Sequence, residues 1–145
     1  MPTAEGRLIR LAADRHGVFT LNEALAVGVT PAALRHRIAA GAVLRVHEGV
    51  FRFAVVPDTW RAGLVAAVLS GGATTLASHR SAARLWELRG VPRWKAEVTA
   101  LGRRLPLIEG VLVHRTDRLD PLDLGAMDGI PCTSASRTLL DLGAV

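Results

Sequence analysis

Residues 17–53, GVFTLNEALAVGVTPAALRHRIAAGAVLRVHEGVFRF, carry the turn and cap signals that decide the fold. Thr20 precedes a short helical pattern that ends at Gly28, because a threonine hydroxyl accepts an unpaired amide N–H and glycine tolerates the positive φ of a helix end. Thr30, followed by a proline, predicts the start of a second helix, which ends at Gly41. Two further apolar runs come next. The sequence therefore predicts a helix-turn-helix followed by a hairpin wing.

The second of these helices presents two different faces. At about 100° per residue, Leu34 and Ile38 share one stripe and are expected to be buried. His36 points away from that stripe, and Arg35 and Arg37 flank it. Arginines on a helix with small outward residues reach phosphates and guanine edges, so the pattern is typical of a DNA-reading helix. A solvated helix with ordinary charges explains the same pattern equally well.

The hairpin adds basic residues next to this helix. Glu48 and Gly49 are a plausible two-residue turn. The resulting register pairs His47 with Val50, Val46 with Phe51, Arg45 with Arg52, and Leu44 with Phe53. One face is then apolar, and the other carries Arg45, His47 and Arg52. Two arginines directly opposite repel each other, and a polyanion beside them would turn that repulsion into attraction. In the alternative, this face is solvated and the arginines splay apart.

Composition and charge agree with a basic globular protein. The chain has 145 residues, half of them hydrophobic, and a net charge of +5 with a pI of about 11.1. Residues 30–56 contain four arginines against Glu48 alone, and such clustering matters more for binding nucleic acid than the total charge. We expect an α+β protein with a winged helix-turn-helix domain over residues 1–56.

The rest of the chain predicts a second, small α/β domain over residues 57–145. Residues 94–101 and 111–116 alternate as strands, and Ser78 is expected to cap a helix with its hydroxyl. A final helix follows Ser134, and the domain is interpreted as truncated at its C-terminus.

Several classes of function lack support. Cys132 is the only cysteine, so no intrachain disulfide forms. No segment has the pattern of a signal peptide or a membrane span, and we expect a cytoplasmic protein. The five histidines and Cys132 do not fall at metal-ligand spacing, and the adjacency of Ser78 and His79 is not catalytic geometry. The sequence thus predicts no metal, no cofactor and no enzymatic activity.

Several segments together resemble a known family. HGVFT at 16–20, the segment 28–41 and RVHEGVF at 45–51 resemble the N-terminal domain of AbiEi-type antitoxins from type IV toxin–antitoxin systems. Further segments resemble the second domain of that family. They are ASHRSAA at 77–83 with LW at 85–86, VHRT at 113–116, DGIP at 128–131, TS at 133–134 and RTLLDL at 137–142. Each segment is weak alone, but their order and spacing are specific.

The resemblance implies a winged-helix DNA binder that represses its own operon and whose second domain counters a nucleotidyltransferase-like toxin. Relatives of this type often continue into a domain resembling very-short-patch repair endonucleases, and this chain stops before one. The expected partners are double-stranded operator DNA, the toxin and a second copy of the chain. The predicted DNA-binding residues are Thr30, Arg35, His36, Arg37, Arg45, His47 and Arg52. Two alternatives stay open: a protein-interaction module, and the DNA-targeting N-terminal portion of a longer nuclease-like protein.

Overall fold

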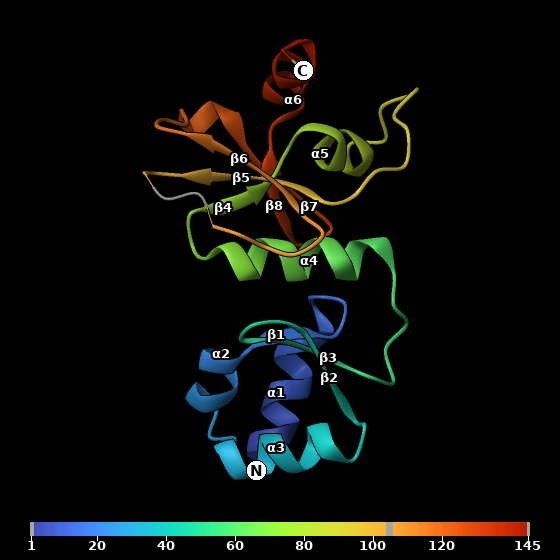
Figure 1. Ribbon diagram of the computed structural model, residues 1–145, viewed down its shortest axis with the longest axis vertical. Helices are drawn as coiled ribbons and strands as arrows, with labels where there is room; N and C mark the ends of the chain where they lie inside the picture. Colours follow the sequence, from blue (N-terminus) through green and yellow to red (C-terminus); the bar gives the residue numbers. More distant parts are fainter. Residues whose placement is uncertain (1, 104–105, 145) are drawn as a thin grey trace. The chain divides into compact units, whose positions relative to one another are not determined.

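A computed structural model describes residues 2–103 and 106–144 (Figure 1). Contacts between Cα atoms divide the chain into two compact units, Met1–Ser70 and Gly71–Val145. Each unit is described by itself below. The predicted domain limits, 1–56 and 57–145, stay a prediction.

The first unit is a winged helix. Four helices and a three-stranded antiparallel sheet make up this unit, and the strand order is β1-β3-β2. The elements are α1 (Ala4–Ala13), β1 (Val18–Thr20), α2 (Leu21–Ala26), α3 (Pro31–Ala39), β2 (Val43–His47), β3 (Val50–Phe53) and α4 (Trp60–Gly71). The strands β2 and β3 form the wing that follows the helix-turn-helix, as the turn signals predicted.

The helix starts follow the predicted caps. Thr20 and Glu23 form a capping box, in which the Thr20 hydroxyl accepts from the Glu23 amide and the Glu23 carboxylate accepts from the Thr20 amide. The hydroxyl of Thr30 accepts from the amide of Ala33, and Pro31 occupies the first turn of α3. Gly28 has a φ of +100°, which an L side chain would not tolerate between the two helices.

An aromatic cluster holds this unit together. The ring of Phe19 lies 5.7 Å from that of Phe51 and 5.0 Å from that of Phe53, measured between centroids. The first three helices supply buried aliphatic side chains to the same core: Leu8 and Ala12 from α1, Ala24 from α2 and Leu34 from α3. Each helix is therefore attached to the sheet through very few side chains.

The register of the wing differs from the predicted one. His47 pairs with Val50 as expected, but Arg45 lies opposite Phe51, and Leu44 lies opposite Arg52. The cause is a β-bulge between Arg45 and His47, which gives β2 one extra residue against β3. The predicted pairing of Arg45 with Arg52 is wrong.

The predicted apolar face of the wing is right for Phe51 and Phe53 but wrong for Leu44, for the same reason. Opposite residues of an antiparallel pair share a face, so Val43 joins Phe51 and Phe53 toward the core. Leu44 falls on the other face and is 41% exposed.

The second unit is a mixed five-stranded sheet with helices. The strand order is β6-β5-β4-β8-β7, with β4–β8 and β5–β6 parallel and the other two pairs antiparallel. Its elements are β4 (Thr75–Ala77), α5 (His79–Leu85), β5 (Glu97–Leu101), β6 (Leu112–Thr116), the 3-10 turn η1 (Pro121–Asp123), β7 (Leu124–Met127), β8 (Ile130–Thr133) and α6 (Ala135–Gly143). The helices α5 and α6 contact each other (Figure 1). The predicted α+β class is confirmed.

Replacing Phe19 by alanine tests the aromatic cluster. Phe19 is fully buried, so Phe19→Ala is expected to lower the free energy of unfolding by about 3–5 kcal/mol. The measurement is denaturant unfolding followed by circular dichroism. Val55→Ala is the control, because Val55 is 89% exposed and its loss is expected to cost less than about 0.5 kcal/mol. Equal costs for the two variants would contradict the assigned core.

Candidate nucleic-acid interface

The helix α3 buries only one of its residues in its own unit. Leu34 is the single buried residue of α3, at 5% exposure, and it packs in the aromatic core. Ile38 was expected to share that buried stripe, but it is 36% exposed and does not belong to the core cluster. The prediction for Ile38 is wrong because the core extends under one turn of the helix and not under the next. Almost the whole surface of α3 is therefore open to a partner.

The three basic side chains of α3 differ in their partners. Arg37 forms an ion pair with Glu5 of α1, and both side chains are exposed by more than two fifths. Arg35 and His36 are exposed, and neither side chain makes a hydrogen bond or ion pair with any residue that the structure describes. An exposed ion pair contributes about 1 kcal/mol or less, so the Glu5–Arg37 contact is easily exchanged for another anion.

The basic residues of the wing also fall into two groups. Arg45 is exposed, and its guanidinium carbon lies 6.0 Å from the centroid of the Phe51 ring. His47 lies at the turn end of β2 and is half-buried. Arg52 is half-buried on the other face of the hairpin and donates to the backbone carbonyls of Phe53 and Val56. The guanidinium of Arg52 thus stabilises the backbone of residues 53–56, which follow the wing.

An acid lies near the face that carries Arg52. A pocket of about 210 Å³ is lined by Leu44, Arg45, Val46, Arg52, Asp58, Ala62 and Gly63. Asp58 contributes a negative charge there, which weakens the attraction of this face for phosphate. The exposed side of α3 and the edge of the wing at Arg45 are the more favourable places for an anionic partner.

The predicted site residues therefore separate by role. Thr30 caps α3, Arg37 and Arg52 have partners within the unit, and Arg35, His36 and Arg45 are exposed. That these side chains contact one common ligand stays a prediction. Sequence reasoning missed a second polar group, in the second unit, where three chain segments bring two histidines and a glutamate together.

No helix in residues 2–103 and 106–144 is long and apolar enough to cross a membrane.

Comparison with protein families gives one finding for this unit. Residues 7–54 match the family model described as "Transcriptional regulator, AbiEi antitoxin". No curated protein matches the chain. The matched segment runs from within α1 to the end of the wing, and it confirms the resemblance noted for the segments between residues 16 and 51. The second unit lies outside the matched segment.

The different roles of the arginines can be tested through stability. Arg52→Ala removes a charged donor from two carbonyls and is expected to lower the free energy of unfolding by about 1–2 kcal/mol. Arg35→Ala removes the same charge from an exposed helix position and is expected to change it by less than about 0.5 kcal/mol. Urea unfolding of both variants is the measurement. If Arg52→Ala were as stable as Arg35→Ala, Arg52 would not have the structural role assigned to it.

Proposed function

We propose that this chain, an AbiEi-type antitoxin regulator over residues 7–54, binds double-stranded DNA with α3 in the major groove and the edge of the wing on the phosphate backbone. In this arrangement Arg35 and His36 read base edges. Arg45 and His47 contact phosphates, and Arg37 joins them once Glu5 releases it.

The observation that carries the proposal is the exposure of α3. This helix buries only Leu34 and begins at the Thr30 cap, so it offers nearly its whole surface to a groove. The other outward residues of α3 include three alanines, so the backbone can approach the bases closely. A guanidinium at the position of Arg35 can donate two hydrogen bonds to guanine, which is the commonest specific contact in the major groove.

Electrostatics favour the same ligand. Residues 30–56 carry four arginines and one acid, Glu48, so this part of the chain is locally cationic. Cationic side chains that release counterions from DNA produce binding that weakens steeply with salt. An ordinary solvated helix would show no such dependence.

The finer parts of the proposal concern regulation. The chain acts as an autorepressor of a type IV toxin–antitoxin operon, and residues 57–145 counter a nucleotidyltransferase-like toxin. A homodimer would place two copies of α3 on two half-sites, one helical turn or a multiple apart, on a palindromic operator.

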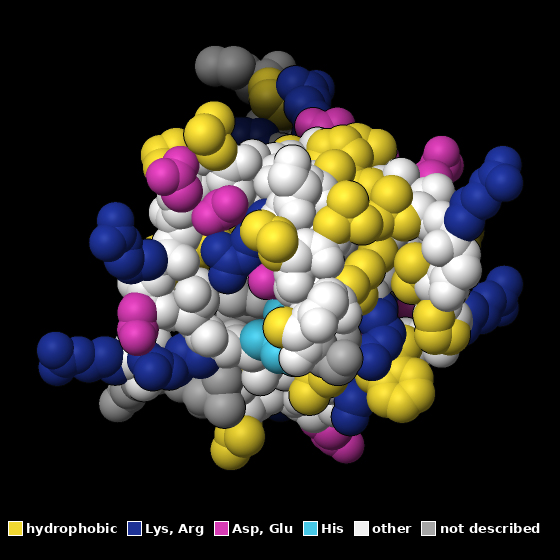
Figure 2. Space-filling view, turned by 90° about the horizontal axis from the view of Figure 1, so that it is seen from above, with side chains coloured by type: hydrophobic (Ala, Val, Ile, Leu, Met, Phe, Trp, Pro, Cys, Tyr) yellow, Lys and Arg dark blue, Asp and Glu magenta, His cyan; other side chains and the backbone are white. Residues whose placement is uncertain are grey.

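A second candidate function is a protein-interaction module formed by the second unit. Exposed leucines favour it: Leu139 and Leu140 of α6 are 59% and 72% exposed. Figure 2 shows hydrophobic side chains gathered on the face that it draws. Large exposed apolar patches mark interaction surfaces more often than they mark bare surface. Association with a toxin without any duplex binding at low salt would favour this function over the first.

Arg35→Ala tests the reading role of α3. It is expected to weaken binding to duplex from the chain's own upstream region by about tenfold or more, because it removes an arginine–guanine contact. The dependence of log affinity on log salt is expected to become shallower by about 1 if Arg35 also neutralises a phosphate. Fluorescence anisotropy at several salt concentrations measures both quantities.

The matched control for Arg35 is Arg10→Ala. Arg10 is an exposed residue of α1, about 200° around the helix from the buried Leu8, so this variant loses the same charge away from α3. Its affinity is expected to stay within about twofold of the parent. Equal losses in the two variants would indicate a general charge effect and would contradict a reading helix.

Glu5→Gln tests whether Arg37 is available to DNA. The substitution breaks the ion pair and removes one negative charge beside α3, so duplex affinity at low salt is expected to rise severalfold. The free energy of unfolding is expected to change by less than about 1 kcal/mol, since the pair is exposed. Glu109→Gln, an exposed acid of the second unit, is the control for net charge. Unchanged or weaker affinity in Glu5→Gln would argue against a DNA contact at Arg37.

A further inference from the structure

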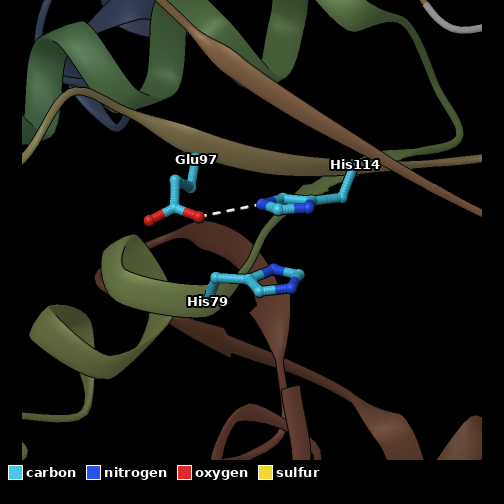
Figure 3. A group of neighbouring side chains, drawn as sticks. All are labelled: His79, Glu97 and His114. Atoms are coloured by element: carbon cyan, nitrogen blue, oxygen red, sulfur yellow. Dashed lines mark hydrogen bonds and ion pairs between the residues drawn. The ribbon is translucent and has the colours of Figure 1, made fainter. Parts of the chain in front are cut away.

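Three side chains that are distant in sequence meet in the second unit. His79 begins α5, Glu97 begins β5, and His114 lies in β6 (Figure 3). One possible ligand atom from each lies within 4.8 Å of the others. The parallel pairing of β5 with β6 places Glu97 and His114 two positions apart in register, because Glu97 lies opposite Leu112. Residues separated by two positions point to the same face of a sheet.

Glu97 is a fully buried carboxylate with two partners. Its Oε1 accepts from Arg80 at 2.8 Å, and its Oε2 lies 2.8 Å from Nε2 of His114. Burial raises the pKa of Glu97, but the hydrogen bonds from His114 and Arg80 outweigh it and hold that pKa below its usual value. A charged oxygen ligand is thus present inside the unit.

The two imidazoles are stacked on each other. Their centroids are 3.6 Å apart and their planes differ by 13° (Figure 3). Burial, and then the neighbouring His114, lower the pKa of His79, so its ring is neutral with a free lone pair at neutral pH. His79 is 8% exposed, whereas the side chain of His114 is 26% exposed and gives access from solvent.

A buried hydroxyl orients the ring of His79. Nδ1 of His79 lies 2.9 Å from Oγ of Ser78, which in turn accepts from Oγ1 of Thr99 at 2.6 Å. The hydroxyl of Ser78 was expected to cap α5, but it makes no cap hydrogen bond and is hydrogen-bonded to the ring of His79 instead. When Nδ1 donates to Oγ of Ser78, Nε2 of His79 is the nitrogen whose lone pair is available to a ligand. Metal-binding histidines usually have such a hydrogen bond on the other ring nitrogen.

We propose that His79, Glu97 and His114 bind one divalent transition-metal ion of the zinc class. Two imidazoles and one carboxylate are a ligand set that suits such ions, and they leave further coordination positions open. Calcium and magnesium are poor candidates, because they prefer oxygen ligands. None of its residues belongs to α3 or the wing, so an experiment can refute the metal site without refuting the proposed DNA binding, and the reverse.

Binding the ion requires a small rearrangement of the cluster. Lone pairs lie in the ring planes, so two parallel rings cannot direct them to one point, and the rings must rotate out of the stack. Ligand atoms around a tetrahedral ion are about 3.3 Å apart, as follows from metal–ligand bonds of about 2.0–2.1 Å. The contact between His114 and Glu97 must therefore widen as the ion replaces the proton on Nε2.

Arg80 limits how Glu97 can bind. The guanidinium of Arg80 donates to Oε1 of Glu97 and lies 5.3 Å from the ring of Trp94. Oε2 of Glu97 is therefore the oxygen that can bind an ion. Glu97 is then a monodentate ligand whose orientation is fixed by a neighbour, as is usual around metal sites. The positive charge of Arg80 also weakens the affinity, which suits an ion that is bound reversibly.

Zinc titration of the chelator-treated full chain tests the proposal. Isothermal titration calorimetry is expected to show one Zn²⁺ per chain, and Co²⁺ is expected to give the visible absorption of a site with nitrogen and oxygen ligands. His114→Ala is the main variant, because its side chain is partly exposed and its loss should leave the fold intact. We expect its zinc affinity to fall by more than about 100-fold, and that of Ser78→Ala by about 10–100-fold.

The control is His36→Ala, which removes an exposed imidazole from α3 and is expected to leave zinc binding unchanged. Circular dichroism establishes that each variant is folded, and Glu97→Gln serves as a second ligand variant if His114→Ala is not. Absence of stoichiometric zinc binding by the parent chain would overturn the proposal. Equal affinity in the parent and in a folded His114→Ala or Glu97→Gln would overturn it as well.

Discussion

The packing of Phe19 against Phe51 and Phe53 is the contact on which the winged unit depends. It joins β1 to β3, and the fully buried aliphatic side chains that α1, α2 and α3 pack against it number one or two for each helix. Leu34 is the only residue of α3 that is buried in this core. The rest of that helix is released from packing and is available to a partner, which is what a helix that enters a groove requires.

The local signals of this unit were readable from the sequence, and its register was not. Caps at Thr20 and Thr30 depend on neighbours three residues away, so the sequence predicts them well. The bulge between Arg45 and His47 depends on how the whole hairpin twists over the core, and a turn at Glu48 and Gly49 does not reveal it. One extra residue moved Leu44 outward and separated Arg45 from Arg52.

The second unit shows a different limit of sequence reasoning. Its class followed from the alternating strands, but the cluster of His79, Glu97 and His114 is invisible to a search for ligand spacing. It arises from strand pairing, because β4, β5 and β6 are neighbours in the sheet although long segments separate them in the chain. The one available signal was the placement of Glu97 at the start of a strand whose other residues are apolar or neutral.

The central claim is that α3 and the edge of the wing together form the surface that contacts DNA. The most direct measurement is the change in backbone amide chemical shifts when duplex DNA is added to the isotope-labelled chain at low salt. The largest changes are expected within residues 30–49, with the amides of α1 and of residues 71–103 and 106–144 little affected. Changes concentrated in the second unit, or none at all in α3, would contradict it.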